Sequence, residues 1–217
     1  HNPAGILWDK ETLQRLAHIC SQHDILVISD EIHCDMALWG KRHVPFASVS
    51  DEAARNSITF GAPSKTFNIA GIVSSYAVVP DEQLRERFFG CVEANELNMS
   101  TFFADIATMA AYKKGEEWRQ QMLHYVEGNI EFVEDYLKAN IPQIKAIRPE
   151  ASFLVWLDCR GLGLSHDELV DLLVNQAHVA FNDGAMFGQE GSGFMRMNVG
   201  APRSVLKQAL ERITAVC

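Results

Sequence analysis

The first third of the chain alternates between a helical apolar pattern and short apolar runs. Between Asp9 and about His23, apolar residues fall every three or four positions, which predicts a helix capped by Asp9. Residues 25–29, ILVIS, then form a continuous apolar run, typical of a strand buried on both faces of a parallel sheet. Residues 57–62 and 72–79 predict two further strands. A helix followed by buried strands predicts an α/β fold with an open, mostly parallel sheet.

The second half of the chain changes character after position 81. Two long helices are predicted, at 101–114 and 116–139, and the second is the best candidate for a connector between domains. Beyond it, the predicted elements are strands at 144–149 and 152–158, a helix from Ser165 with a Ser165–Glu168 capping box, strands at 179–182 and 194–199, and a last helix after Pro202. This order predicts a large domain over residues 1–130 and a smaller α/β domain over residues 131–217.

Composition and charge narrow the function classes. The chain has 19 basic and 28 acidic residues, a net charge of −9, which argues against a broad nucleic-acid or anionic-membrane surface. No apolar run approaches the roughly 20 residues that span a bilayer. The 5 cysteines are scattered and odd in number, so we expect neither a disulfide framework nor a metal site, and we expect a cytoplasmic protein.

Polar residues with chemical potential follow two of the predicted strands. Asp30 comes directly after the run 25–29, and Ser64 and Lys65 follow the run 57–62 after a short turn. In an open α/β sheet, ligands bind beyond the carboxyl ends of the strands, so these residues are predicted at one sheet edge. Taken singly, each has a plainer interpretation: Asp30 as a turn or cap residue, and Lys65 as a solvated surface charge.

Four strings together resemble one family. HNPAG at 1–5, SDEIHCDM at 29–36, APSKTFNIAG at 62–71 and FMRMNVGAPR at 194–203 stand in the order and at the separations seen in the aminotransferase class I/II family of fold-type I pyridoxal-phosphate enzymes. Any one string is a weak signal, but four in order are a strong one. The resemblance implies pyridoxal 5'-phosphate as cofactor, a large and a small α/β domain, and a homodimer with an amino-acid substrate.

The resemblance also implies roles for particular residues. Lys65 would bind the cofactor aldehyde covalently and act as the catalytic base. Asp30 would pair with the pyridinium nitrogen, Asn2 would donate to the ring oxygen, and Ser64 would donate to the phosphate. Arg196 would hold the substrate α-carboxylate with its two-pronged guanidinium, although a surface ion pair is the plainer interpretation.

Two departures from the wider family point to a subgroup. His33 stands where many aminotransferases have tyrosine, and Val73 stands where many have an arginine that grips the phosphate. The string DEIH resembles the cystathionine β-lyase-like subgroup of MalY/PatB type, with His33 at the cofactor; a partly buried histidine bonded to backbone is the alternative. The resemblance to the wider family therefore does not extend to an arginine contact with the phosphate.

The function implied is a carbon–sulfur β-lyase that releases thiol, pyruvate and ammonia from a cystathionine-like substrate. An aminotransferase of the same fold is the alternative, since the two reactions share their first steps, and a non-catalytic interaction module is a second one. Family members run to about twice this length, so the chain is expected to be a C-terminal portion with little activity alone. Cys91–Phe103 is the segment expected at the pocket or at a subunit interface.

Overall fold

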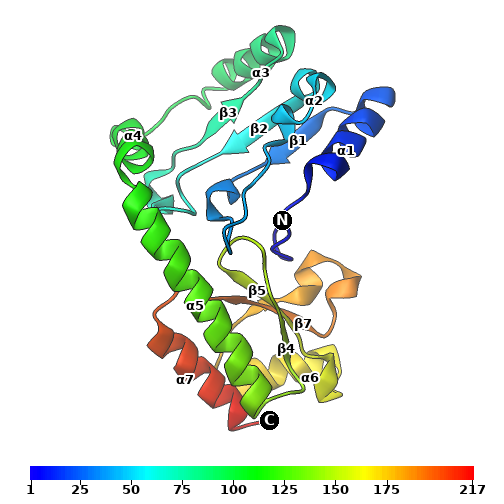
Figure 1. Ribbon diagram of the computed structural model, residues 1–217, viewed down its shortest axis with the longest axis vertical. Coiled ribbons are helices and arrows are strands. Elements are labelled where there is room, and N and C mark those ends of the chain that lie inside the picture. Colours follow the sequence, from blue (N-terminus) through cyan, green and yellow to red (C-terminus); the bar gives the residue numbers. More distant parts are fainter. The chain divides into compact units, whose positions relative to one another are not determined.

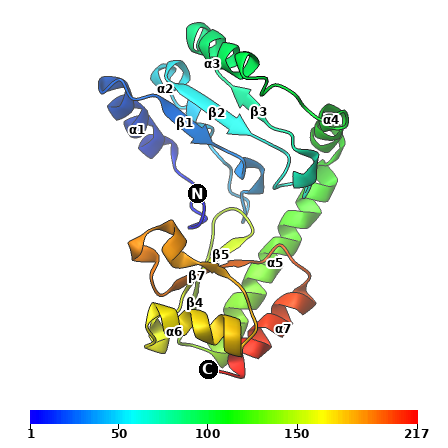
Figure 2. The same cartoon turned by 180° about the vertical axis from the view of Figure 1, so that it is seen from behind.

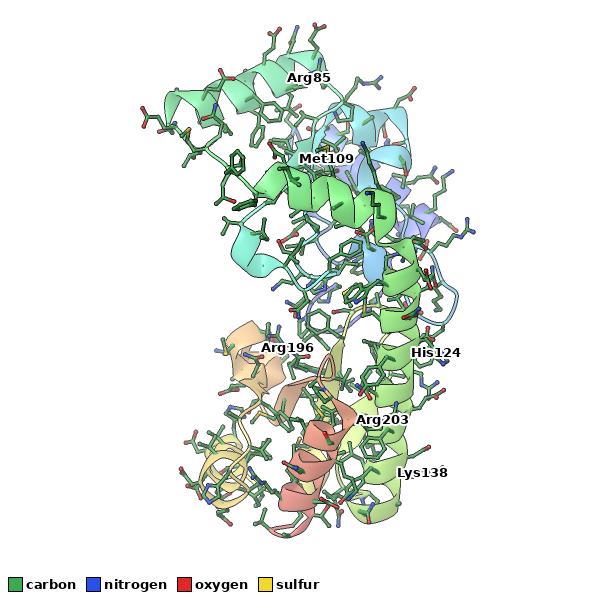
Figure 3. The ribbon with its side chains drawn as sticks, turned by 90° about the vertical axis from the view of Figure 1, so that its left-hand side faces the viewer. Arg85, Met109, His124, Lys138, Arg196 and Arg203 are labelled. Atoms are coloured by element: carbon green, nitrogen blue, oxygen red, sulfur yellow. The ribbon has the colours of Figure 1, made fainter.

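The computed structural model describes residues 1–217, which form two compact units. One unit consists of residues Leu7–Gln121, and the other joins His1–Ile6 to Met122–Cys217. Figures 1 and 2 show the elements of each unit from two sides, and Figure 3 adds the side chains. The assignment of residues 1–130 to a large cofactor-binding domain and 131–217 to a small one remains a prediction.

The unit of residues Leu7–Gln121 is built around a three-stranded sheet. Its elements are α1 (Lys10–Gln22), β1 (Val27–Asp30), α2 (Asp51–Arg55), β2 (Ser57–Gly61), β3 (Tyr76–Val78), α3 (Glu82–Ala94), α4 (Ala104–Lys114) and the start of α5 (Glu116–Asn140). The strand order is β1-β2-β3; β1 and β2 are parallel, and β2 and β3 are antiparallel. The α/β class is confirmed, but the sheet is mixed rather than mostly parallel, because β3 returns beside β2 instead of crossing over.

The first helix forms as its sequence predicts. The Asp9 side chain accepts a hydrogen bond from the Thr12 N–H at 2.8 Å and so caps the first turn of α1. The apolar stripe of α1 enters a core cluster shared with α2 and the segment before it, whose buried members are Leu13, Ala17, Phe46, Val49 and Ala53. This packed cluster supports β1 and the loop that follows it.

Two expectations for this unit need correction, and one helix was missed. The strand β1 is not buried on both faces: Ile28 is 56% exposed, because no element of this chain covers that face. The strand expected at 72–79 is limited to β3, and a short 3-10 helix occupies Ala70–Ile72. Helix α3 was not predicted, because it buries no residue and so lacks an apolar stripe; its N-cap Asp81 was the available signal.

The second unit contains an antiparallel sheet and two long helices. Its elements are the remainder of α5, β4 (Lys145–Ile147), β5 (Leu154–Asp158), α6 (His166–Asp171), β6 (Asn182–Asp183), β7 (Phe194–Asn198) and α7 (Arg203–Thr214). The strand order is β4-β5-β7-β6, with every pair antiparallel. The predicted capping box at Ser165 and Glu168 is present, whereas the strand expected at 179–182 is reduced to β6.

Helix α5 carries the core of this unit on one face. Its buried apolar residues recur at alternating spacings of three and four and are Leu123, Val126, Ile130, Val133 and Leu137, and the buried Asn129 lies among them. The polar member of this stripe, Asn129, is fully buried and donates to the carbonyl oxygens of Val199 and Ala201, both at 2.9 Å. Asn129 thereby anchors the loop after β7 to the helix. No helix of either unit has the length and apolarity needed to cross a membrane.

Candidate active site

Asp30 and the loop that carries Lys65 leave the sheet at the same edge. Asp30 is the last residue of β1 and lies opposite Phe60 in the parallel β1–β2 register. The Glu31 N–H donates to the Phe60 carbonyl oxygen at 2.8 Å, which extends the ladder by one bond. The strand β2 ends at Gly61, so Lys65 follows four residues after the same edge. The strand register therefore starts the loop after Asp30 and the loop that carries Lys65 at one sheet edge, and the roles of the two residues remain predictions.

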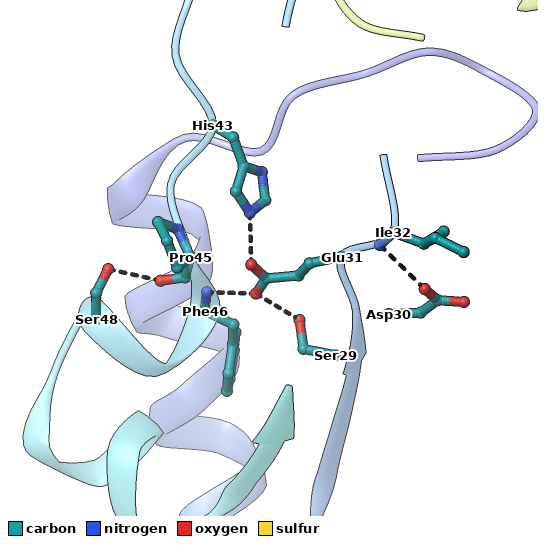
Figure 4. Close-up of polar contacts among 8 residues, drawn as sticks. All are labelled: Ser29, Asp30, Glu31, Ile32, His43, Pro45, Phe46 and Ser48. Carbon is teal, nitrogen blue, oxygen red and sulfur yellow. Dashed lines mark hydrogen bonds and ion pairs between the residues drawn. The ribbon is translucent and has the colours of Figure 1, made fainter. Parts of the chain in front are cut away.

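Asp30 presents its carboxylate to solvent from a fixed backbone. Its side chain is exposed, and its Oδ1 accepts a hydrogen bond from the Ile32 N–H at 3.2 Å. A carboxylate with an exposed oxygen at the end of a strand can accept a further hydrogen bond from a protonated ligand nitrogen. Figure 4 shows this carboxylate beside the buried side chain of Glu31, which points the other way, toward His43 and Phe46.

The loop around Lys65 is anchored while Lys65 itself is exposed. The Phe67 N–H donates to the Pro63 carbonyl at 2.9 Å and the Ile69 N–H to the Ser64 carbonyl at 3.1 Å, which closes two helical turns around position 65. Thr66, the next residue, is buried. An exposed amine on a loop held this tightly can reach a ligand without an entropic cost for ordering the backbone.

An aromatic cluster fixes the far side of this loop. The ring of Phe67 stacks on Trp118 with centroids 5.8 Å apart and meets Tyr112 edge to face at 5.7 Å. A Cβ at Gly115 would lie 2.6 Å from the Phe67 ring, so the glycine between α4 and α5 makes room for that ring. Phe67 was not predicted to have a role; the available signal was an aromatic residue two positions after the lysine.

The remaining predicted residues of this unit lie along the same loops. Ser64 is partly buried, and its Oγ donates to the Ser74 carbonyl oxygen at 3.4 Å, a long bond that a phosphate oxygen could replace. His33 is partly buried and precedes the 3-10 turn Cys34–Met36. Val73 is exposed and adopts a left-handed conformation with φ 56°.

Asn2 and Arg196 come together in the second unit although they are 194 positions apart. The Arg196 guanidinium donates through Nη1 to the Asn2 Oδ1 at 2.5 Å and through Nη2 to the Asn182 Oδ1 at 2.8 Å, and it lies 4.8 Å above the Phe187 ring. Both acceptors are neutral amides, and Nε is buried without a partner. Burial lowers the pKa of Arg196. A partly desolvated cation without a carboxylate among these contacts fits an anionic ligand.

The donor set of the chain fits pyridoxal phosphate chemically. An exposed carboxylate, an exposed amine and a hydroxyl leave one sheet edge of the first unit, matching a pyridinium nitrogen, an aldehyde and a phosphate. In the second unit, engagement of the Asn2 Oδ1 by Arg196 leaves the Asn2 amide N–H groups as donors for a ring oxygen. The first unit therefore offers chemically matched side chains for a ring nitrogen, an aldehyde and one phosphate oxygen, and the second unit offers one for a ring oxygen.

Known proteins resemble the chain over nearly all of its residues. It is 41% identical to cystathionine beta-lyase PatB of Bacillus subtilis, over 99% of this chain and 56% of that protein, and 32% identical to protein MalY of Escherichia coli, over 96% and 53%. The structure of cystalysin from Treponema denticola, which contains a pyridoxal 5'-phosphate cofactor, has a TM-score of 0.94 and 35% identity, over 100% of this chain and 55% of that one. The chain thus spans about half the length of the relatives it matches. Because the family model for aminotransferase class I and II matches residues 1–213, the chain belongs to that family.

Proposed function

We propose that the protein is a pyridoxal-phosphate-dependent carbon–sulfur β-lyase acting on a cystathionine-like amino acid. The observation that carries this proposal is the common origin of Asp30 and the Lys65 loop at the carboxyl ends of two neighbouring parallel strands. The likeness to a relative named for cystathionine β-lyase activity supports the choice of reaction. The string DEIH, with His33 in place of tyrosine, supports the same choice.

When bound, pyridoxal phosphate supplies an electron-withdrawing ring that stabilises negative charge on the substrate α-carbon. The Asp30 carboxylate holds the proton on the ring nitrogen, since a negative charge beside it favours the protonated form. Ser64 would donate to the phosphate, Asn2 would donate to the ring oxygen, and His33 would contact the cofactor.

Lys65 and Arg196 act on the amino-acid substrate. Arg196 orients the substrate by binding its α-carboxylate through two parallel hydrogen bonds. Lys65 Nζ would hold the cofactor through its aldehyde, and the lysine amine, once displaced by the substrate amine, would serve as the base for the α-carbon proton. Loss of the thiol from the β-carbon comes next, and addition of water gives pyruvate and ammonia as the remaining products.

The aminotransferase alternative shares the proton abstraction by Lys65 and differs in the fate of the substrate afterwards. An aminotransferase returns the proton to the cofactor side and passes the amino group to a keto acid, whereas the lyase expels the thiol. The decisive experiment uses the protein as its gene encodes it, supplied with L-cystathionine, and measures thiol and pyruvate release against keto-acid-dependent amino transfer. Release of both products without a keto acid supports the lyase; transfer without thiol release supports the aminotransferase.

Variants of two exposed lysines separate catalysis from the third possibility, a non-catalytic interaction module. Lys65→Ala is expected to abolish product formation by removing both the covalent anchor and the base. Lys10→Ala, at the exposed start of α1, is the matched control and is expected to leave the rate unchanged. Absence of activity and of cofactor binding in the unaltered protein would favour the interaction module.

We further propose that the protein forms a homodimer in a reducing cytoplasm. Between α3 and α4 the chain exposes large apolar side chains, among them Met99 at 84% and Phe102 at 83%, a surface that a second copy would cover. The five cysteines are free thiols, in keeping with a reducing compartment. Sedimentation equilibrium tests the dimer; a monomer at micromolar concentration would contradict it.

A further inference from the structure

The carboxylate next to Asp30 is buried and saturated with hydrogen-bond donors. Glu31 is only 8% exposed, and its Oε1 accepts from the Ser29 Oγ at 3.0 Å and from the Phe46 N–H at 2.8 Å. Its Oε2 lies 2.7 Å from the His43 Nε2, which must donate because a carboxylate only accepts. Figure 4 shows the three donors converging on this one side chain. Neither Glu31 nor His43 was assigned a role from the sequence.

These contacts keep Glu31 ionised despite its burial. Burial alone raises the pKa of a carboxyl, but the hydrogen bonds from His43 and the Phe46 N–H outweigh it, so the pKa of Glu31 lies below its ordinary value. Hydrogen bonds to an ionised acceptor are about twice as strong as neutral ones. The cluster of Glu31, His43, Ser29 and the Phe46 N–H, which we call the Glu31 latch, is therefore a strong local tie.

The Glu31 latch connects the peptide that carries Asp30 to the rigid part of its unit. The Glu31 N–H is bonded to Phe60 on β2 and the Glu31 carbonyl oxygen accepts from the Cys34 N–H at 2.9 Å, so every polar group of this residue is engaged. At the other end of the latch, the Phe46 ring is buried in the core cluster beneath α1 and α2. A substitution in the Glu31 latch is therefore expected to alter the backbone conformation of Asp30, one residue away.

We propose that Glu31, held by His43, is a positioning residue that fixes the direction of the Asp30 carboxylate toward the cofactor ring nitrogen. The inference rests on the proposed function for the identity of the ligand, pyridoxal phosphate. It rests on the geometry of the Glu31 latch for the way in which Asp30 is held. Asp30 is exposed and contributes little packing of its own, so its direction depends on the backbone of residues 30–32. The buried side chain of Glu31 provides the rigidity that the exposed side chain of Asp30 lacks.

The experiment compares latch variants with a matched surface pair in the protein as its gene encodes it. Glu31→Ala removes the acceptor, and His43→Ala removes one donor. His43→Gln restores an amide donor at about the same reach. The control is Glu52→Gln, which disrupts a second histidine–glutamate pair of the same unit, with His18 at 3.4 Å, both side chains being well exposed.

Two measurements are made on each variant. Hydrogen exchange of the Ile32, Cys34 and Phe46 amides in cofactor-free protein reports the rigidity of the latch. Titration with pyridoxal phosphate, followed by the absorbance of the bound cofactor, reports its affinity and the protonation of its ring nitrogen. For Glu31→Ala we expect faster exchange, an altered absorbance spectrum and a cofactor Kd raised about tenfold, the effect of losing one charge-assisted hydrogen bond network.

His43→Ala is expected to show the same changes in smaller measure, His43→Gln to restore wild-type values, and Glu52→Gln to differ from wild type in neither measurement. Faster exchange in Glu31→Ala with unchanged affinity and spectrum would overturn the inference, because the latch would then be structural only. Should Glu31→Ala fail to fold, His43→Ala and its rescue by His43→Gln decide the same question. Failure of unaltered protein to bind the cofactor would instead overturn the proposed function, a result distinct from a latch variant that binds normally.

Discussion

Asn129 ties the loop that follows Arg196 to helix α5, and its removal should be costly. The side chain is fully buried, donates to the carbonyls of Val199 and Ala201, and accepts from the Arg203 Nε at 3.0 Å. Asn129→Ala deletes all three bonds and leaves two carbonyls and one guanidinium N–H to find new partners.

The loss of unfolding free energy in Asn129→Ala depends on which polar groups are left without a hydrogen-bond partner. A buried carbonyl without a partner costs about 1–3 kcal/mol, but the Arg203 side chain is exposed and can regain water, so its share is small. The sum is about 3 kcal/mol of unfolding free energy, which for a chain of this size corresponds to roughly 6–12 °C in Tm.

The assay is urea denaturation followed by hydrogen exchange of the second unit, with Asn140→Ala as matched control. Asn140 is also an asparagine of α5, but it is exposed and makes its bond to the Tyr136 carbonyl at the end of the helix. Its removal is expected to cost under about 0.5 kcal/mol. If the two alanine variants lose the same stability, the account of Asn129 as an anchor is wrong.

Two further predictions concern charge. Arg196→Gln is expected to lower kcat/KM by at least about tenfold, mainly through KM, because the charged pair with the substrate carboxylate is lost. The control is Arg160→Gln, which changes an exposed arginine over the Phe194 ring. Equal losses of kcat/KM in both variants would refute the assignment of Arg196. Glu31, whose pKa is lowered on folding, contributes stability that is full above its unfolded value near 4.5 and is lost as the pH falls through the lower folded-state pKa. Acid titration of unfolding should therefore show a shallower loss of stability for Glu31→Gln below pH 4.5 than for unaltered protein, and identical acid slopes would contradict this.

The sequence predicts local elements well where one physical cause dominates. The cap of α1 at Asp9 and the capping box at Ser165 depend on residues three positions apart, so both are readable from the chain. The burial of β1 cannot be predicted in this way. An apolar run shows that a strand has side chains suited to burial, but not which other elements cover them. Ile28 belongs to such a run and is nevertheless more than half exposed.

The same distinction between local and distant causes applies to the residues of the candidate site. Asp30 and Lys65 could be placed at one sheet edge because strand ends are visible in the sequence and parallel neighbours share their direction. The hydrogen bond between Arg196 and Asn2 was not predicted, since the two residues are separated by nearly the whole chain. The Glu31 latch escaped sequence reasoning because the donors His43 and Phe46 lie 12 and 15 residues away in a loop without periodic pattern.

A common arrangement surrounds the three charged candidates of the site. Each side chain is at least partly open to solvent, and each has a buried neighbour in the chain: Glu31 after Asp30, Thr66 after Lys65, and Met195 before Arg196. For Asp30 and Lys65, whose own side chains are exposed, the constraint on direction comes from the adjacent residue through the shared backbone, whereas the Arg196 guanidinium is also held by Asn2, Asn182 and the Phe187 ring. Substitutions at these neighbours should therefore alter ligand affinity more than their own distance from the ligand suggests, and the Glu31 variants are the most direct test because Glu31 is held by hydrogen bonds that can be removed one at a time.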